Sequence, residues 1–183
     1  REISELQRHF YYALLGDIIN WSGEAKEVID EYFHNLYWEK NCGEEISLKD
    51  GSSNSMSDAK RLIDYVIDFI FDNQVPVKKG YELLPRNEEH FQYECLMHKQ
   101  CLICGQRADF HHVDTVGMGN NRNKTDHTKH RVMALCRVHH TEFHKIGLTE
   151  FCKKSHLTII GIRLSKDDLK KLGVKGNYEQ ATT

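Results

Sequence analysis

Cysteine and histidine pairs at two places in the 183-residue chain have the spacing of a metal site. Cys101 and Cys104 form a C-x-x-C pair, and Cys136 and His139 form a C-x-x-H pair after 31 intervening residues. Each pair can wrap one side of a tetrahedral zinc ion from a tight turn, because zinc binds thiolate and imidazole well. This part of the chain is irregular and poor in apolar residues, so the zinc would replace a hydrophobic core. We therefore predict a structural zinc site made of these four residues.

Four further histidines, which are not among these zinc ligands, have a spacing that suits catalysis. His140 and His144 lie four residues apart on a predicted helix, which places both imidazoles on one face. His111 and His112 are adjacent on a predicted strand, where successive side chains point to opposite sides. One of that pair can then bind a cation while the other acts as a base. The sequence predicts a second cation site, separate from the zinc.

The pattern around these residues resembles the HNH, or ββα-metal, nucleases, in particular those of phages that infect Gram-positive bacteria. The match is carried by D-F-H-H-V-D-T-V-G-M-G at residues 109–119 and by H-R-V-M-A-L-C-R-V-H-H-T-E-F-H at residues 130–144. It covers about residues 95–165. The resemblance implies an enzyme that hydrolyses DNA phosphodiester bonds with Mg²⁺, Mn²⁺ or another divalent ion.

The resemblance also gives each of these four histidines a role. His112 matches the general base that activates the attacking water, and His111 matches the metal ligand just before that base. His140 and His144 match further histidine ligands of the catalytic cation.

The asparagine that the family places in the middle of the motif is absent from this chain. The corresponding positions hold His130 and Arg131, with His127 nearby, and one of these would orient the base or touch phosphate. A basic loop with two glycines is predicted over residues 117–129. The residues predicted to contact phosphate or DNA are Arg122, Lys124, His127, His130 and Arg131.

Charge and histidine content separate the chain into two parts. Residues 1–94 hold 10 Lys and Arg against 19 Asp and Glu, whereas residues 95–183 hold 15 against 8. Nine of the twelve histidines lie at or after His98. An acidic part followed by a basic, histidine-rich part predicts two modules, of which the second faces a polyanion.

The predicted fold class is α+β. A mainly helical module is expected at residues 1–90, a zinc-stabilised ββα-metal module at 91–174 and a disordered tail at 175–183. In the first module, helices are predicted over 3–18, 25–37 and 57–73, the last capped by Ser57, with a short strand at 46–48. In the second module, strands are predicted over 108–116, 132–135 and 156–164. Helices are predicted over 87–99, capped by Asn87, and over 138–146, ended by Gly147. A short helical turn from residue 149 and a last short helix that begins at Ser165 and Asp168 complete the module.

The first half of the chain resembles phage Orf/NinB-like recombination proteins. The resemblance lies in Q-R-H-F-Y-Y-A-L-L-G-D-I at residues 7–18, I-S-L-K-D at 46–50 and S-D-A-K at 57–60. It implies binding of single-stranded DNA and dimerisation. DNA binding needs cations against phosphate, whereas residues 1–94 are acidic. Two alternatives stay open for this half, DNA binding through a local basic patch and a role in dimerisation or packing.

Two functions remain for the whole chain. The first is a metal-dependent HNH endonuclease, a homodimer acting on single-stranded or branched DNA in phage recombination, repair or replication. The second is a non-catalytic zinc-ribbon module that binds DNA or a protein partner and needs only the four zinc ligands. A C-x-x-C redox protein would leave the Cys136 and His139 pair unexplained.

Hydropathy and cysteine usage suggest the compartment. No apolar run approaches the roughly 20 residues that a membrane helix needs, and no signal-peptide pattern is present. Of the six cysteines, only Cys101 and Cys104 form a C-x-x-C pair, and in such a chain this pair favours metal binding or redox chemistry over a disulfide framework. We expect a cytoplasmic protein, in the host bacterial cytoplasm if it is phage-encoded.

Overall fold

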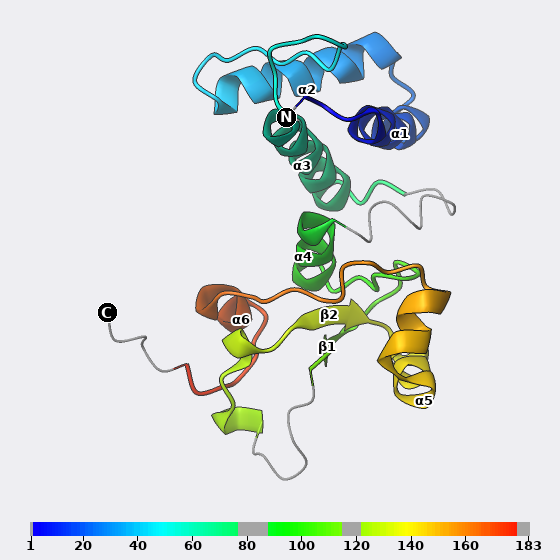
Figure 1. Cartoon of the computed structure of the whole chain (residues 1–183), viewed down its shortest axis with the longest axis vertical. Coiled ribbons are helices and arrows are strands. Elements are labelled where there is room, and N and C mark those ends of the chain that lie inside the picture. Colours follow the sequence, from blue (N-terminus) through cyan, green and yellow to red (C-terminus); the bar gives the residue numbers. More distant parts are fainter. Residues whose placement is uncertain (1, 77–87, 115–121, 179–183) are drawn as a thin grey trace. The chain divides into compact units, whose positions relative to one another are not determined.

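The computed structural model describes residues 2–76, 88–114 and 122–178 (Figure 1). The chain divides into two compact units, Arg1–Tyr81 (unit 1) and Glu82–Thr183 (unit 2). Within the described residues, no helix has the length and apolar character needed to cross a membrane.

Unit 1 consists of three helices that pack against one another: α1 (Glu5–Ser22), α2 (Lys26–Lys40) and α3 (Met56–Asp72) (Figure 1). Each helix contributes an apolar stripe to a shared core, as the three- and four-residue spacing predicts. The largest fully buried side chains of this core are Tyr11, Leu14, Leu15, Ile18, Phe33, Tyr37, Leu62 and Ile67. The three predicted helices are therefore confirmed.

The cap of α3 differs from the prediction. Ser55, and not Ser57, caps the helix: its Oγ accepts a hydrogen bond from the Asp58 N–H at 3.3 Å, and the Asp58 carboxylate accepts one from the Ser55 N–H at 2.7 Å. The prediction was wrong because Asp58 lies three residues after Ser55 and so completes a reciprocal capping box. The Ser55 N–H is also the main reason that the pKa of the Asp58 carboxyl falls to about 2.

Residues 46–48, predicted as a short strand, run as a loop. Ile46 and Leu48 are both buried, as expected from the alternation of apolar and polar residues in this segment. The Ser47 N–H, however, donates to the Asn54 side-chain oxygen at 2.8 Å instead of to a neighbouring strand. The Asn54 amide donates in turn to the Glu45 carbonyl oxygen at 3.1 Å. A side chain thus satisfies the backbone groups that a sheet would otherwise pair.

Unit 2 is organised around two antiparallel strands, β1 (Asp109–His112) and β2 (Val132–Leu135). Their register pairs His111 with Met133 and His112 with Val132. Every residue of β2 is buried, and helices pack against this strand. The other elements of the unit are α4 (Glu89–Met97), the 3₁₀ turns η2 (Arg122–Lys124) and η3 (His127–Lys129), α5 (Arg137–Lys154) and α6 (Lys166–Lys171) (Figure 1).

The predicted strand over 156–164 is wrong. A single bridge joins Ile162 to Val132, with reciprocal N–H to carbonyl hydrogen bonds of 2.8 and 2.9 Å. Gly161 bends the chain beside it with a φ of 66°, and a Cβ there would lie 2.7 Å from Val113 Cγ2 and 3.0 Å from the Val132 oxygen. Only glycine fits this approach, so the pairing stops after one bridge. The strand predicted at 132–135 is confirmed. Of the strand predicted at 108–116, β1 covers 109–112, and residues 115–116 lie outside the described residues.

The helices of unit 2 follow the predicted punctuation closely. Gly147, with φ 80° and ψ 168°, breaks α5 where the sequence predicted a stop, and a shorter helical stretch follows it. Ser165 caps α6 by accepting from the Asp168 N–H at 3.2 Å, as predicted. α4 begins after Glu88, whereas the predicted cap Asn87 lies outside the described residues. Helices with one small sheet fit the predicted α+β class.

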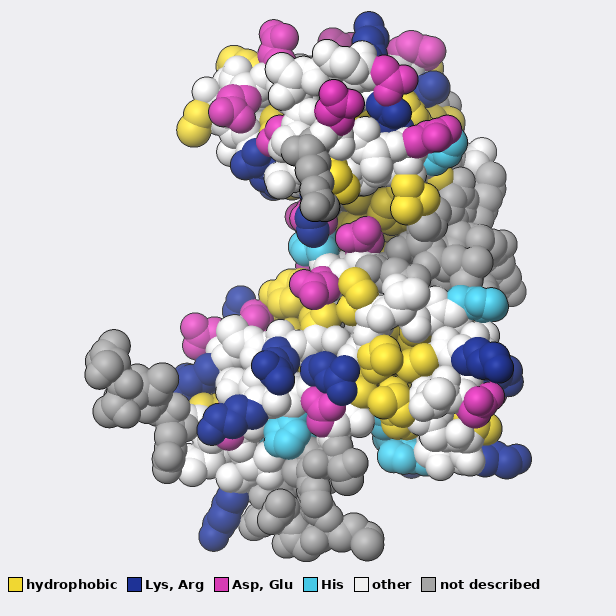
Figure 2. Space-filling view, in the orientation of Figure 1, with side chains coloured by type: hydrophobic (Ala, Val, Ile, Leu, Met, Phe, Trp, Pro, Cys, Tyr) yellow, Lys and Arg dark blue, Asp and Glu magenta, His cyan; other side chains and the backbone are white. Residues whose placement is uncertain are grey.

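The two units differ in charge. Unit 1 holds 9 Lys and Arg against 15 Asp and Glu, and unit 2 holds 16 against 12. Figure 2 shows acidic side chains spread over the visible face of unit 1 and basic side chains over that of unit 2. The positive balance of unit 2 suits a polyanionic ligand.

An ion pair fastens the residues that follow β1 to the start of β2. The Asp114 carboxylate accepts from Arg131 Nε at 3.1 Å, from Nη2 at 2.6 Å and from the Arg131 backbone N–H at 2.7 Å. The Val113 N–H donates to the Arg131 carbonyl oxygen at 2.9 Å. The Arg131 guanidinium holds the pKa of the Asp114 carboxyl below its ordinary value. This contact extends the strand pairing past His112.

We expect Asp114→Asn to lower the free energy of unfolding of unit 2 by about 1 kcal/mol at pH 7, because the pair is half-exposed and therefore screened. The pKa of Asp114 is depressed in the folded state, so its contribution is present above the unfolded value of 3.8 and is lost as pH falls through the folded value. Urea unfolding should show a difference from wild type that shrinks below about pH 4. Asp109→Asn, on the same strand and exposed, is the control. A pH-independent difference would contradict this account.

Candidate active site and metal centre

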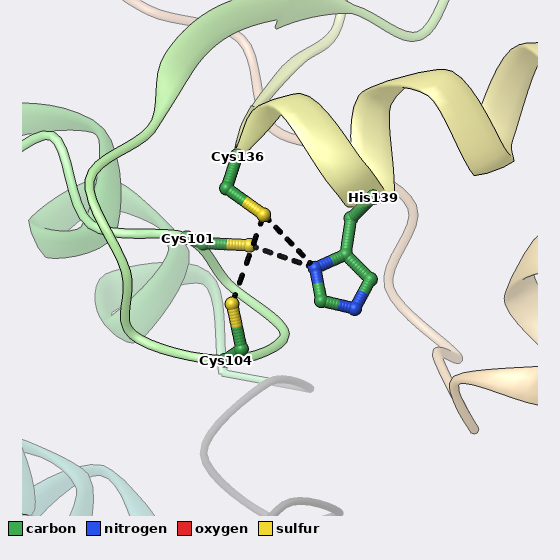
Figure 3. A group of neighbouring side chains, drawn as sticks. All are labelled: Cys101, Cys104, Cys136 and His139. Carbon is green, nitrogen blue, oxygen red and sulfur yellow. Dashed lines mark hydrogen bonds between the residues drawn. The ribbon is translucent and has the colours of Figure 1, made fainter.

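The four predicted zinc ligands come together in unit 2, in a group we call the Cys cluster (Figure 3). Cys136 Sγ lies 3.2 Å from His139 Nδ1 and 3.7 Å from Cys104 Sγ. Cys101 Sγ lies 3.5 Å from His139 Nδ1. The four ligand atoms all lie within 4.8 Å of one another. In a tetrahedral zinc site, sulfur atoms about 2.3 Å from the ion are roughly 3.8 Å apart, so these spacings fit such an ion.

Backbone hydrogen bonds build the turn that carries two of these ligands. The Gly105 N–H donates to the Cys101 carbonyl oxygen at 2.8 Å, with Gly105 at φ 70°. The Leu102 N–H donates to the Ala134 carbonyl oxygen at 2.9 Å and so joins the turn to β2. Two residues beyond Ala134, Cys136 is the N-cap residue immediately before α5. The sheet therefore places both halves of the Cys cluster beside each other.

The thiols of the Cys cluster have opposite pKa shifts. Burial, together with the nearby Cys101 thiol, raises the pKa of Cys104 to about 12. Burial acts in the same direction on Cys136, but hydrogen bonds from the His139 N–H, from the Cys104 and Cys101 thiols and from the Val138 N–H bring the pKa of its thiol below the ordinary value. Three thiolates this close repel one another, and a divalent cation would compensate that repulsion.

Three histidines form a second group, which we call the His cluster: His111 on β1 with His140 and His144 on α5. One ring nitrogen from each lies within 4.8 Å of the other two. His140 Nε2 and His144 Nε2 are 3.0 Å apart, as expected for residues four apart on one helix face. The His111 ring contacts both, with centroid distances of 4.5 and 5.3 Å.

His111 is the buried member of the His cluster. It is 2% exposed, and its Nε2 is buried without a hydrogen-bond partner in the described part of the chain. Burial, reinforced by the neighbouring His140 and His144, lowers the pKa of His111 to about 3, so the ring is neutral at pH 7. A buried polar atom left unpaired is costly, roughly 1–3 kcal/mol. A cation bound to that nitrogen would remove the cost.

The donor set of the His cluster restricts which ion it can hold. Three imidazole nitrogens suit zinc or another first-row transition ion better than Mg²⁺, which prefers oxygen ligands. Three protein ligands also leave coordination positions for water or a phosphate oxygen, as catalytic sites require. The buried Phe143 ring makes an edge-to-face contact with the His111 ring, with a centroid distance of 4.4 Å.

His112 lies on the other face of β1. Its Nε2 is 2.7 Å from His127 Nδ1, and the two ring centroids are 4.8 Å apart. Adjacent residues of one strand thus contact different parts of unit 2, His111 contacting α5 and His112 contacting η3, which is the alternation that a strand imposes.

The residues predicted to contact phosphate or DNA have different surroundings. Lys124 is exposed on η2, which also includes Arg122, and His130 is half-buried with its ring 6.1 Å from that of His112. His127 is 2% exposed, so its side chain is buried within unit 2. The Arg131 side chain is occupied by the Asp114 carboxylate.

Two features of the site had no signal in the sequence prediction. Asp114 lies within the family motif, but its pairing with Arg131 depends on a turn of the chain that residue spacing does not reveal. Residues 175–178, predicted within a disordered tail, contact η3 and the residues just before it. His127 Nε2–H donates to the Lys175 carbonyl oxygen at 3.2 Å, and the Asn177 N–H donates to the Thr125 carbonyl oxygen at 3.1 Å. Residues 179–183 of that tail lie outside the described residues.

Comparison with known proteins identifies the class. Residues 1–175 match the family model described as "Putative HNHc nuclease", so the chain belongs to this HNH nuclease family. The match spans both units. A search of curated proteins and a search of solved structures found no match.

We expect Co²⁺, used as a probe for zinc, to bind the Cys cluster of the metal-free protein and to give thiolate-to-metal absorption. Cys104→Ser should weaken that absorption. In the zinc-loaded full-length protein, it should also lower the melting temperature of unit 2 by about 10 °C or more, because metal binding by the four ligands contributes folding free energy. Cys42→Ser, at an exposed cysteine in unit 1, is the matched control. Equal absorption in the Cys104 and Cys42 variants would show that the Cys cluster does not bind the metal.

Proposed function

We propose that this protein is a metal-dependent endonuclease that hydrolyses phosphodiester bonds of DNA. In this proposal, unit 2 carries the reaction, the Cys cluster holds a structural zinc, and the His cluster holds the catalytic cation. His112 is the general base. The single observation that carries the proposal is the unpaired buried nitrogen of His111 beside His140 and His144, with His112 on the opposite face of the same strand.

Each group has one role in the proposed reaction. The His112 imidazole accepts a proton from a water molecule, and the water oxygen forms a bond to phosphorus. The bond from phosphorus to the leaving sugar oxygen breaks, and its electron pair stays on that oxygen, which then takes a proton from solvent. The cation, when bound, stabilises negative charge on the phosphate and on the leaving oxygen. Neutral His111 is ready to act as a ligand because its pKa is far below 7.

The finer context of the reaction is also proposed. The sequence resemblances support a role in phage recombination, repair or replication, with single-stranded or branched DNA as substrate. The positive balance of unit 2 supports a polyanionic substrate there, and basic residues such as Lys124 would contact its phosphates. Unit 1, with its acidic balance, would serve dimerisation or bind DNA through a local basic patch. In a phage-infected cell the protein would work in the host cytoplasm.

Nicking of supercoiled plasmid and cleavage of single-stranded, flap and four-way DNA, each with Mn²⁺, Zn²⁺, Ni²⁺ or Mg²⁺, test the proposal. We expect cleavage that depends on the added ion and is abolished by a chelator. His112→Ala should lower the rate by about 100- to 10,000-fold, because the base is lost while the cation ligands stay. His144→Ala should require a higher metal concentration for half-maximal rate.

His9→Ala provides the control for these substitutions, since His9 lies in unit 1 and is largely exposed. It should leave the cleavage rate unchanged. Equal rates for wild type and His112→Ala, or one tightly held zinc and no effect of added ions on cleavage, would overturn the nuclease proposal and favour a non-catalytic zinc-ribbon module.

A further inference from the structure

A chain of hydrogen bonds leads from the general base into the interior of unit 2. His112 Nε2 is 2.7 Å from His127 Nδ1, and His127 Nε2–H donates to the Lys175 carbonyl oxygen at 3.2 Å. His127 itself is 2% exposed. We propose that His127 is the positioning residue that fixes the ring orientation and tautomer of His112, and that residues 174–178, the C-terminal strap, hold His127 in place. This inference rests on the proposed role of His112.

The identity of the last acceptor decides where the protons lie. A carbonyl oxygen can only accept, so His127 carries a proton on Nε2. In neutral His127 the other nitrogen, Nδ1, is then an acceptor, and the proton between the two rings belongs to His112 Nε2. His112 therefore keeps its lone pair on Nδ1. The chain selects the one tautomer whose Nδ1 can take a proton from water while Nε2 stays hydrogen-bonded to the protein.

The C-terminal strap approaches His127 too closely for any residue but glycine at one position. A Cβ added at Gly176 would lie 2.7 Å from His127 Cδ2 and 2.6 Å from the Thr125 carbonyl oxygen. The Asn177 N–H donates to that same oxygen at 3.1 Å, and the Tyr178 ring lies 6.3 Å from the His127 ring. The contacts made by Asn177 and Tyr178, together with the close approach of Gly176, thus hold the strap against His127.

Each end of this arrangement is tied to a regular element. The Val174 N–H donates to the Leu169 carbonyl oxygen of α6 at 2.9 Å, which anchors the start of the strap. Asp126 Oδ1 accepts from the Thr128 N–H at 3.1 Å and from the Thr128 hydroxyl at 2.6 Å, which fixes the turn that presents His127. His127 is therefore held from its backbone and from its ring.

Two near-isosteric substitutions separate positioning from simple packing. In His127→Asn, the side-chain oxygen can occupy the place of Nδ1 and still accept from His112. In His127→Gln, the terminal amide reaches the place of Nε2 and can still donate to the Lys175 carbonyl oxygen, but no acceptor faces His112. We expect His127→Asn to retain most of kcat and His127→Gln to lose about 10- to 100-fold in kcat with little change in KM.

Gly176→Ala tests the role of the C-terminal strap. It should lower kcat, but by a smaller factor than His127→Gln does, since the added Cβ displaces the strap. Gly16→Ala, which adds the same methyl group in open space on α1, should leave kcat unchanged. If His127 only fills space, the Asn and Gln variants would instead lose activity equally, in proportion to their loss of melting temperature, and that result would overturn the inference.

The tautomer of His112 can be measured without any cleavage. Two-bond ¹⁵N–¹H correlation spectra of the full-length, ¹⁵N-histidine-labelled, zinc-loaded protein should show His112 protonated on Nε2 in the wild type and in His127→Asn, and a mixture in His127→Gln. Protonation of wild-type His112 on Nδ1 would contradict the inference. If His112→Ala is inactive but His127→Gln has wild-type kcat, the inference alone fails; if His112→Ala is fully active, the proposed function fails.

Discussion

The pairing of β1 with β2 is the constraint on which the rest of unit 2 depends. Both strands are short, and their register places His111 opposite Met133 and His112 opposite Val132. Because side chains alternate along a strand, this register turns one histidine toward α5 and the next toward η3. A shift of one residue would exchange the two faces and separate the proposed base from His127 and the proposed ligand from α5. The proposed cation binding and the proposed proton transfer would thus depend on the same few backbone hydrogen bonds.

The Cys cluster and the sheet support each other. The turn that carries Cys101 and Cys104 is joined to β2 at Ala134, and β2 continues directly into Cys136. A metal bound there would hold the start of α5 against the sheet, and α5 carries two members of the His cluster. In a unit of this size, whose sheet has two short strands, such a bound ion would stabilise the fold.

Much of this arrangement follows from spacing alone. The C-x-x-C and C-x-x-H pairs, the four-residue interval between His140 and His144, and the helix break at Gly147 are local signals, and the structure agrees with each. What spacing could not predict depends on contacts between distant segments. The strand predicted at 156–164 is reduced to one bridge by the approach of Gly161 to Val132, and the burial of His127 depends on residues that follow it by almost fifty positions.

Anomalous diffraction from crystals grown with zinc and then soaked in Mn²⁺ tests the central claim most directly, since that claim is the division of metal chemistry between two separate sites. Data at the zinc and manganese edges should show zinc within the Cys cluster and a second, exchangeable ion bound by His111, His140 and His144. A single metal peak at the Cys cluster, with the His cluster empty at saturating Mn²⁺ and Zn²⁺, would contradict the account.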